Sequence, residues 1–369
     1  MSVTTIAEMA SSLLPSDPPV QFIDEHGDQH AHERYEMPSP QTLLDAYAAL
    51  VVGRRVDQQA TTLVRQGQLA VYPSSQGQEA CQIGSVLALR PTDWLFPTYR
   101  ESVALITRGV DPVEVLSMLR GEWHCGYEPR RHFAAPQTTP LATQTIHAVG
   151  VAYAAQLRDE DTVALAYLGD GATSEGDFHE AINFAGVFKA PVIFFVQNNH
   201  YAISVPLAKQ TAAPSLAHKG IGYGVRGERV DGNDVAAVIS VISDAADRAR
   251  AGGGPTLIEA HTYRMAAHTN ADDATRYRIQ EEVQTWQDKD PVDRLRTYLR
   301  TSGQLNEEKE AEFADRADAV TADVRTRFLA GLPPIPPSEL FAHVLAAPTP
   351  QLRSQADQLR AELAAEGEE

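Results

Sequence analysis

The chain has 369 residues, of which 43% are apolar and 22% charged, an ordinary composition for a globular protein. Its 31 Lys and Arg residues against 49 Asp and Glu give a formal net charge of −18. A surface this acidic repels phosphate backbones and anionic lipids, so we expect no binding to nucleic acid or to a membrane surface.

Targeting and cysteine patterns exclude further classes of protein. No Lys or Arg precedes Arg34, so we expect neither a secretory signal nor a transit peptide. The apolar runs are too short to span a bilayer. Cys81 and Cys125 form no CxxC pair, which argues against a disulfide framework and a thiolate zinc site. We therefore predict a cytoplasmic protein.

The first part of the sequence predicts an arm followed by helices. Residues 1–38 are polar, acidic and rich in proline, so we expect a loose, solvated arm. A polar loop without periodicity is expected at Gly126–Gln144. Apolar residues at three- and four-residue steps, or a helix-starting Asp-Pro, predict helices at Pro40–Arg65, Gln78–Leu89, Asp111–Leu119 and Ile146–Leu157.

The middle of the sequence alternates apolar strands with helices. The predicted strands are Thr162–Leu168, Pro191–Val196 and Thr256–Ala260, and the helices between and after them are Glu175–Phe188 and Asp234–Arg250. Strands that are apolar on both faces and alternate with helices form a parallel sheet covered by helices on both sides. We therefore predict an α/β domain at 39–332. A proline-rich link and an acidic helix from Thr349 follow at 333–369, after a helix at about 306–329.

A Gly-Asp-Gly turn follows the first predicted strand, at Gly169, Asp170 and Gly171. Glycines and a helix N-terminus at the carboxyl end of a parallel strand suit a diphosphate. Asp170 would repel that diphosphate unless a divalent cation such as Mg²⁺ bridges the two. Asn199 follows the next predicted strand and offers a neutral oxygen at the adjacent edge. A dinucleotide fingerprint, which here lacks its third glycine, and a plain capped turn are the alternatives.

Residues 169–176 together with 196–201 resemble the thiamine-diphosphate motif. Further matching segments are Trp94–Glu101, Thr139–Gln144, Val230–Asp234 and Ala267–Asp273. In this order they resemble the alpha subunit of the decarboxylating component of 2-oxo acid dehydrogenase complexes, from about residue 20 to 363. The resemblance implies the thiamine-diphosphate-binding fold, with helical extensions at both termini, and thiamine diphosphate and Mg²⁺ as cofactors.

The resemblance also implies individual site residues. The Mg²⁺ ligands would be Asp170, Asn199 and the backbone carbonyl of Tyr201. The cofactor contacts would be Tyr99, Arg100, Thr139, Leu141, Gly169, Gly171, Ala172, Gln197 and His268. A potassium site of some members matches Thr138, Pro140, Thr143 and Gln144. His268 and His132 correspond to active-site histidines, and a histidine that titrates near neutrality suits proton transfer. Gln197 stands where some members have Arg.

The implied activity is the oxidative decarboxylation of a small 2-oxo acid, with transfer of the acyl group to the lipoyl domain of a dihydrolipoyl acyltransferase component. In this family a beta subunit supplies the glutamate that activates the cofactor, within a heterotetramer of two alpha and two beta subunits. The N-terminal third of this chain is helical and leaves no room for a second α/β domain that would carry such a glutamate.

The substrate is less sharply indicated. Three segments look slightly closer to branched-chain alpha subunits, namely Asp93–Pro97, Thr143–Ala148 and Thr211–Lys219. Branched-chain 2-oxo acids are therefore narrowly favoured, with pyruvate next. The alternatives are a subunit of another thiamine enzyme, of acetoin dehydrogenase or transketolase type, a dinucleotide-dependent oxidoreductase, and a non-catalytic structural partner with the same fold.

Overall fold

The computed structural model describes residues 11–121, 125–331 and 336–367. It contains two compact units, Met1–Arg325 and Thr326–Glu369. Part of the predicted proline-rich link, residues 333–335, lies outside the described residues. The predicted domain limits at 38–39 and 332–333 stay predictions.

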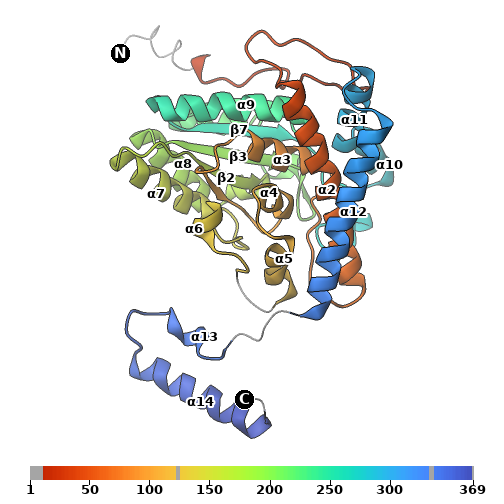
Figure 1. Cartoon of the computed structure of the whole chain (residues 1–369). Helices are drawn as coiled ribbons and strands as arrows, with labels where there is room; N and C mark the ends of the chain where they lie inside the picture. Colours follow the sequence, from red (N-terminus) through yellow and green to blue (C-terminus); the bar gives the residue numbers. More distant parts are fainter. Residues whose placement is uncertain (1–10, 122–124, 332–335, 368–369) are drawn as a thin grey trace. The chain divides into compact units, whose positions relative to one another are not determined.

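A five-stranded parallel sheet forms the centre of the first unit (Figure 1). In spatial order its strands are β1 (Trp94–Phe96), β2 (Ala164–Gly169), β3 (Val192–Asn198), β7 (Thr256–His261) and β6 (Arg226–Asp231). Every neighbouring pair is parallel. The predicted parallel sheet is confirmed, and its three predicted strands are correct to within two residues. The carboxyl ends of all five strands therefore lie at one edge.

The sequence did not predict β1 or β6, and each case has a local reason. β1 has only three residues, and β6 places four charged residues among its six. Both are edge strands, which have a neighbour on one side only. Neither shows the continuous apolar run by which a buried strand is recognised.

The helices agree with their predicted ranges to within three residues where helices were predicted. Those of the first unit are α2 (Pro40–Arg65), α3 (Glu79–Leu87), α4 (Ser102–Thr107), α5 (Pro112–Arg120), α6 (Pro129–His132), α7 (Thr143–Leu157), α8 (Gly176–Phe188), α9 (Val235–Arg248), α10 (Gln280–Gln287) and α11 (Pro291–Thr301). They are followed by α12 (Glu307–Ala330), α13 (Glu339–Ala342) and α14 (Pro350–Glu366). Within the described ranges, no helix is both long and apolar enough to cross a membrane. The predicted polar loop at 126–144 is partly wrong, because α6 lies inside it and α7 begins before its end.

Helices cover both faces of the sheet, as predicted (Figure 1). Tyr167 and Phe195 point to the face covered by α3 and α9, whereas Ala166 and Phe194 point to the face covered by α7 and α8. All four side chains are fully buried. Because successive strand residues point to opposite faces, a strand buried on both sides is apolar throughout.

The solvated arm that the sequence predicts at 1–38 is partly wrong, because a short apolar run within it is buried, although most residues at 25–34 are exposed. Residues 1–10 of this arm lie outside the described residues. Val20 pairs with Val230 beside β6, and Val20, Phe22 and Ile23 are at most 2% exposed. The backbone N–H groups of Phe22 and Ile23 donate to the Asp234 carboxylate at 2.6 and 2.8 Å. The prediction was wrong because the burial of this short apolar run depends on β6 and α9, about 200 residues further along the chain.

The contact between α3 and α9 depends on a glycine. A Cβ added at Gly84 would lie 2.8 Å from Cγ1 of Val238 and 3.2 Å from the carbonyl oxygen of Val235. We expect Gly84→Leu to lower the free energy of unfolding by about 1–3 kcal/mol or more, because overpacking forces neighbouring backbone to shift. Urea unfolding followed by circular dichroism measures the change.

Gly150 on α7 provides the matched control, because a Cβ there would meet no described atom within 4 Å. Gly150→Ala should be neutral, or stabilising by up to about 1 kcal/mol, through helix propensity and lower chain entropy. Equal destabilisation by both variants would contradict the close helix contact.

Candidate functional site

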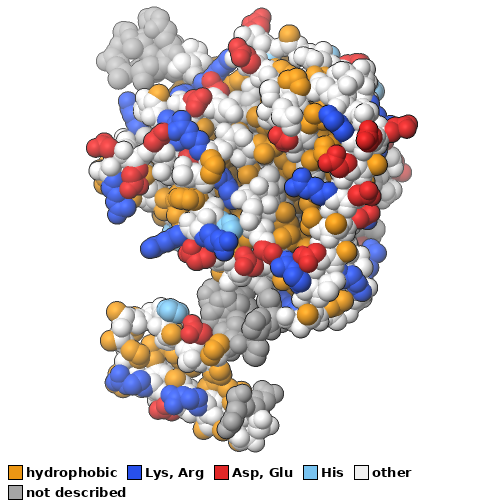
Figure 2. Space-filling model, viewed as in Figure 1, with side chains coloured by type: hydrophobic (Ala, Val, Ile, Leu, Met, Phe, Trp, Pro, Cys, Tyr) orange, Lys and Arg blue, Asp and Glu red, His pale blue; other side chains and the backbone are white. Residues whose placement is uncertain are grey.

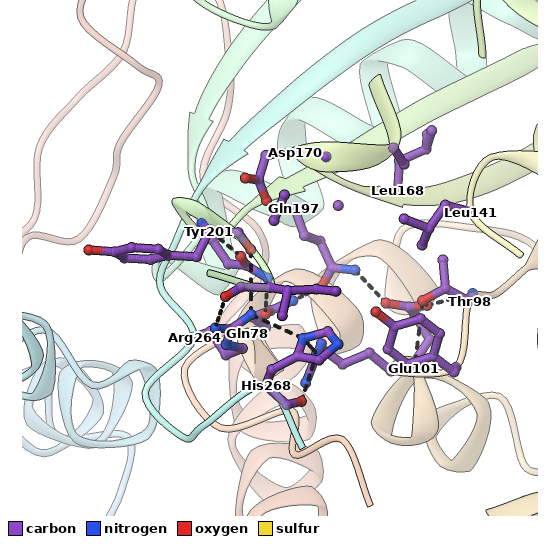
Figure 3. Close-up of a pocket in the computed structure, with 18 of the residues that line it drawn as sticks. Gln78, Thr98, Glu101, Leu141, Leu168, Asp170, Gln197, Tyr201, Arg264 and His268 are labelled. Carbon is purple, nitrogen blue, oxygen red and sulfur yellow. Dashed lines mark hydrogen bonds between the residues drawn. The ribbon is translucent and has the colours of Figure 1, made fainter. Parts of the chain in front are cut away.

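A pocket opens at the carboxyl edge of the sheet, where four strands end (Figure 3). Its walls come from the segments that follow β1, β2, β3 and β7, together with the loop before α7. The cavity volume is about 190 Å³. Because parallel strands bring their carboxyl ends together, residues distant in the sequence meet here.

Most of the predicted site residues line this pocket. They are Tyr99, Arg100, Leu141, Gly169, Asp170, Gly171, Ala172, Gln197, Asn199, Tyr201 and His268. Thr139 and His132 do not line it. Thr139 is exposed in the loop before α7, and His132 lies in α6 with its ring 6.4 Å from that of Tyr127. The roles of Thr139 and His132 stay predictions.

The four residues predicted for potassium lie in the same loop and at the start of α7. Thr138 pairs with Thr98 beside β1, and Pro140 is exposed. Thr143 Oγ1 donates to the Asp177 carboxylate at 3.1 Å. Gln144 Nε2 donates to the carbonyl of Tyr167, whereas the buried Gln144 Oε1 has no partner among the described residues. The potassium site stays a prediction.

The Asp170 carboxylate, the Asn199 amide and the Tyr201 carbonyl converge on one side of the pocket. The Asn199 amide lies 3.2 Å from Asp170 Oδ1 and 3.1 Å from the carbonyl oxygen of Tyr201. That carbonyl also accepts from Arg264 Nη1 at 3.4 Å. The Tyr201 ring points away from the pocket (Figure 3), and its hydroxyl donates to Glu282 at 2.8 Å. Burial raises the pKa of Asp170, and the hydrogen bond from Gln210 acts against this rise. The Asn199 amide donates to both oxygens when its NH₂ group faces them, and its oxygen faces them when a cation lies between, because hard cations prefer oxygen ligands.

Two buried arginines also line the pocket. Arg100 is 5% exposed and Arg264 1%, and neither forms an ion pair with a carboxylate of the described residues. Arg264 donates to the carbonyl of Ile203 at 2.8 Å, and its buried Nε has no partner in the part of the chain that the structure describes. Burial and the neighbouring Arg100 lower the pKa of Arg264. Buried cations without a counter-charge favour an anionic ligand.

His268 lies between these arginines. Its Nδ1 accepts from Arg100 Nη2 and from Arg264 Nη1, both at 3.2 Å. Because arginine can only donate, the neutral His268 ring carries its proton on Nε2. Burial, Arg100 and Arg264 together lower the pKa of His268 to about 4. The Asp272 carboxylate accepts from the His268 backbone N–H at 2.9 Å and holds the loop.

The Gly-Asp-Gly turn shapes the floor of the pocket. A 3-10 turn, Gly171–Ser174, follows Asp170, and α8 begins only at Gly176. A Cβ added at Gly171 would lie 2.7 Å from Cβ of Ala202 in the hairpin of β4 (Tyr201–Ala202) and β5 (Val205–Pro206). A side chain at Gly171 would therefore fill the space beside Asp170.

Comparison with known proteins places the chain in a family. The family model described as "Dehydrogenase E1 component" matches residues 47–326. The chain belongs to the dehydrogenase E1 component family. It is 51% identical over 347 residues, 94% of each chain, to the 3-methyl-2-oxobutanoate dehydrogenase subunit alpha of Mycobacterium tuberculosis. It is 43% identical over 301 residues, 81% of each chain, to the pyruvate dehydrogenase E1 component subunit alpha of Staphylococcus aureus. The predicted family is confirmed.

This E1 family implies thiamine diphosphate, and the pocket fits the diphosphate end of that cofactor. Arg100 and Arg264 are buried without a carboxylate partner among the described residues, which suits phosphate oxygens. Gly171 leaves the backbone accessible where a side chain would not fit.

Some lining residues were not singled out from the sequence. They are Gln78, Thr98, Glu101, Leu168, Glu175, Ala202, Ile203 and Arg264. Thr98 and Glu101 flank two predicted contacts, Tyr99 and Arg100. Arg264 follows the end of a predicted strand, and because ligands bind at the carboxyl ends of parallel strands, this position could have indicated a site residue. Gln78 had no such signal, because only the tertiary structure brings the start of α3 to the end of β3.

The low pKa of His268 depends on its cationic neighbours, which can be tested. Arg264→Met should raise the pKa of His268 from about 4 toward the ordinary 6.5, because one of two adjacent positive charges is removed. Titration of ¹³Cε1-labelled histidines by NMR measures the shift, and His268→Gln identifies the signal.

Arg229→Met is the matched control, because Arg229 contacts a different histidine, His261, at 3.2 Å. This variant should leave the His268 titration unchanged. An unchanged pKa of His268 in Arg264→Met would show that its arginine neighbours do not set the charge state.

Proposed function

We propose that this chain is the alpha subunit of a cytoplasmic 2-oxo acid dehydrogenase. With thiamine diphosphate and Mg²⁺ it decarboxylates a small 2-oxo acid oxidatively and acylates the lipoyl group of a dihydrolipoyl acyltransferase component. One observation carries the proposal: Asp170, Asn199 and the Tyr201 carbonyl line the same pocket as two buried arginines that form no ion pair within the described residues. A cation beside a diphosphate satisfies both sides at once.

Each side of the pocket then has a role. Asp170, Asn199 and the carbonyl of Tyr201 would hold Mg²⁺. Arg100 and the backbone at Gly169, Gly171 and Ala172 would hold the diphosphate. Tyr99 and Thr139 from the predicted contacts would join them, as would Arg264, which the structure adds. Gln197, also predicted as a contact, has both amide atoms bonded to Glu101 and Gln78. Leu141 and Leu168 form an apolar wall. When bound, thiamine diphosphate supplies the electron sink for loss of carbon dioxide.

The histidines would handle protons and charge. His268 is neutral and holds its proton on Nε2, so it can donate a hydrogen bond or a proton to a bound substrate. His132 is proposed as a second catalytic histidine from the loop that contains α6. A potassium ion at Thr138, Pro140, Thr143 and Gln144 would order that loop, and the orphaned Gln144 Oε1 supports a ligand there.

Two features support a beta subunit that completes the site and supplies the activating glutamate. The cavity of about 190 Å³ is smaller than the roughly 300–1,000 Å³ of typical ligand pockets, so this chain supplies only part of a cofactor site. Apolar side chains of α7 and α8 are also exposed: Leu157 68%, Phe184 42%, Val187 69% and Phe188 41%. Figure 2 shows hydrophobic side chains over this region. Such a surface suits burial in a heterotetramer.

The acyltransferase component would need a docking surface on this chain, and the net charge does not show where that surface lies. On the face shown in Figure 2, basic and acidic side chains are interspersed. The acidic balance of −18 is therefore not gathered into one field on this face.

For the substrate we propose branched-chain 2-oxo acids, with pyruvate second. The relative named for 3-methyl-2-oxobutanoate is 51% identical over 94% of the chain, whereas the relative named for pyruvate is 43% identical over 81%. The two substrates differ only by methyl and methylene groups, each worth about 1–3 kcal/mol in an apolar pocket.

The metal bridge predicts that cofactor binding depends on Asp170. Asp170→Ala should weaken Mg²⁺-dependent thiamine diphosphate binding by about 100-fold or more, since even outer-shell partners of a metal cost about 10–100-fold. Titration calorimetry of the complex with its beta subunit, with and without Mg²⁺, measures this. Asp273→Ala, which removes an exposed carboxylate of the His268 loop, serves as control. Unchanged affinity in Asp170→Ala would refute the bridge.

The proposed assembly predicts that the alpha chain alone is inactive and that adding the beta subunit creates activity. A competition assay on the reconstituted enzyme then compares kcat/KM for 3-methyl-2-oxobutanoate and pyruvate. We expect the branched substrate to be preferred. A preference for pyruvate above about tenfold, or about 1.4 kcal/mol, would overturn the substrate assignment. Decarboxylation by the pure alpha chain would overturn the assembly.

A further inference from the structure

A row of buried side chains connects the metal side of the pocket to Glu101. Asn199 Nδ2 donates to Gln78 Oε1 at 2.9 Å, and Gln78 Nε2 donates to Gln197 Oε1 at 3.2 Å. Gln197 Nε2 then donates to Glu101 Oε1 at 2.7 Å (Figure 3). These four side chains are at most 6% exposed. We call this row the amide relay.

Glu101 gives the relay its direction. Its other oxygen, Oε2, accepts from the Thr98 backbone N–H at 2.6 Å and from the Thr98 hydroxyl. Burial raises the pKa of Glu101, whereas the hydrogen bonds from Thr98 and Gln197 and the charge of Arg100 lower it and favour the ionised form. An ionised carboxylate only accepts hydrogen bonds, so Gln197 then turns its NH₂ group toward Glu101. The Gln197 oxygen then faces the NH₂ group of Gln78, and the Gln78 oxygen faces the NH₂ group of Asn199.

The last step places the Asn199 oxygen on the pocket side, beside Asp170 and the carbonyl of Tyr201. Without a cation, the opposite amide orientation would be locally better there. The NH₂ group would lie 3.2 Å from Asp170 Oδ1 and 3.1 Å from the Tyr201 carbonyl. This opposite orientation would also put the Asn199 oxygen 2.9 Å from the Gln78 oxygen. To relieve that contact, the Gln78 and Gln197 amides would both have to turn over, which would bring the Gln197 oxygen against the Glu101 carboxylate.

We propose that Glu101, Gln197 and Gln78 are positioning residues that hold Asn199 with its oxygen toward Asp170 and Tyr201, ready to ligate a divalent cation. The proposal rests on the metal site proposed above. It assigns Gln197 a task inside the protein, because both of its amide atoms are engaged by Glu101 and Gln78. The relay fixes which end of the Asn199 amide faces the metal site, and no charge moves along it.

An isosteric change at the far end should reverse the whole relay. In Glu101→Gln, the Thr98 backbone N–H keeps the new amide oxygen in place, so the new NH₂ group faces the NH₂ group of Gln197. Turning Gln197, Gln78 and Asn199 restores the hydrogen bonds but points the Asn199 NH₂ group into the metal site. We expect Mn²⁺ affinity to fall about 10–100-fold, the range for outer-shell partners.

A second change should restore the ligand. In Glu101→Gln with Gln78→Glu, the new carboxylate accepts from the turned Gln197 on one side and from Asn199 on the other. Asn199 then presents its oxygen to the metal again, and Mn²⁺ affinity should return to within about threefold of the wild type. The pair keeps the number of buried carboxylates constant. The rescue factor is the ratio of the Mn²⁺ affinity of the double variant to that of Glu101→Gln. Gln78→Glu alone should not raise Mn²⁺ affinity above the wild type by this factor.

Glu259→Gln provides the matched control. Glu259 is 1% exposed on β7 and accepts from the neighbouring amide Asn198 Nδ2 at 2.7 Å. It is thus a buried carboxylate bonded to an amide outside the relay. Its loss should leave Mn²⁺ affinity within about threefold of the wild type.

The experiment titrates Mn²⁺ into the complex with its beta subunit at saturating thiamine diphosphate, and electron paramagnetic resonance counts free Mn²⁺. Circular dichroism checks each fold. If the wild type binds no Mn²⁺, the proposed metal site itself fails. If the wild type binds and Glu101→Gln equals it, or the double variant stays weak, the relay is wrong. If Gln78→Glu alone strengthens binding by the rescue factor, the rescue is electrostatic and the relay is also wrong.

Discussion

The parallel pairing of β2 with β3 is the constraint on which the site depends. The Asp170 carboxylate, the Asn199 amide and the Tyr201 carbonyl meet because these strands pair with Gly169 opposite Gln197. That register places both strand ends at the same height, and the turn into β4 adds the carbonyl. A one-residue slip of β2 against β3 would move the segment that carries Asp170 relative to the segment that carries Asn199. The pairing of the two strands therefore sets the spacing of these side chains.

Positive and negative groups meet in the same pocket. Arg100 and Arg264 concentrate positive charge a few residues after β1 and β7, while Asp170 and Asn199 follow β2 and β3. The proposed metal-bound diphosphate would satisfy both kinds of group. Burial together with these two arginines lowers the pKa of His268 and keeps its ring neutral, so the positive charge of the pocket also bears on the protonation state of a catalytic candidate.

Position 197 holds a buried glutamine whose two ends bond to Glu101 and Gln78. In the proposed site the two arginines would bind the anion, and the amide relay would orient a ligand of the cation. The exposed apolar surface of α7 and α8 and the small cavity fit a chain that forms one side of a larger site.

The sequence by itself determined the parallel sheet, because continuous apolar runs alternate with helical periodicity at 162–260. It also located Asp170 and Asn199, because strand-end glycine, aspartate and asparagine carry a local chemical signature. The tertiary structure alone decided three features: the burial of Val20–Ile23 against β6, the place of Arg264 beside His268, and the contact of Gln78 with Gln197. Each depends on pairing between segments far apart in the chain. Local propensity and patterning report what one segment prefers, whereas the partner that satisfies a buried polar group is set only when the chain is packed.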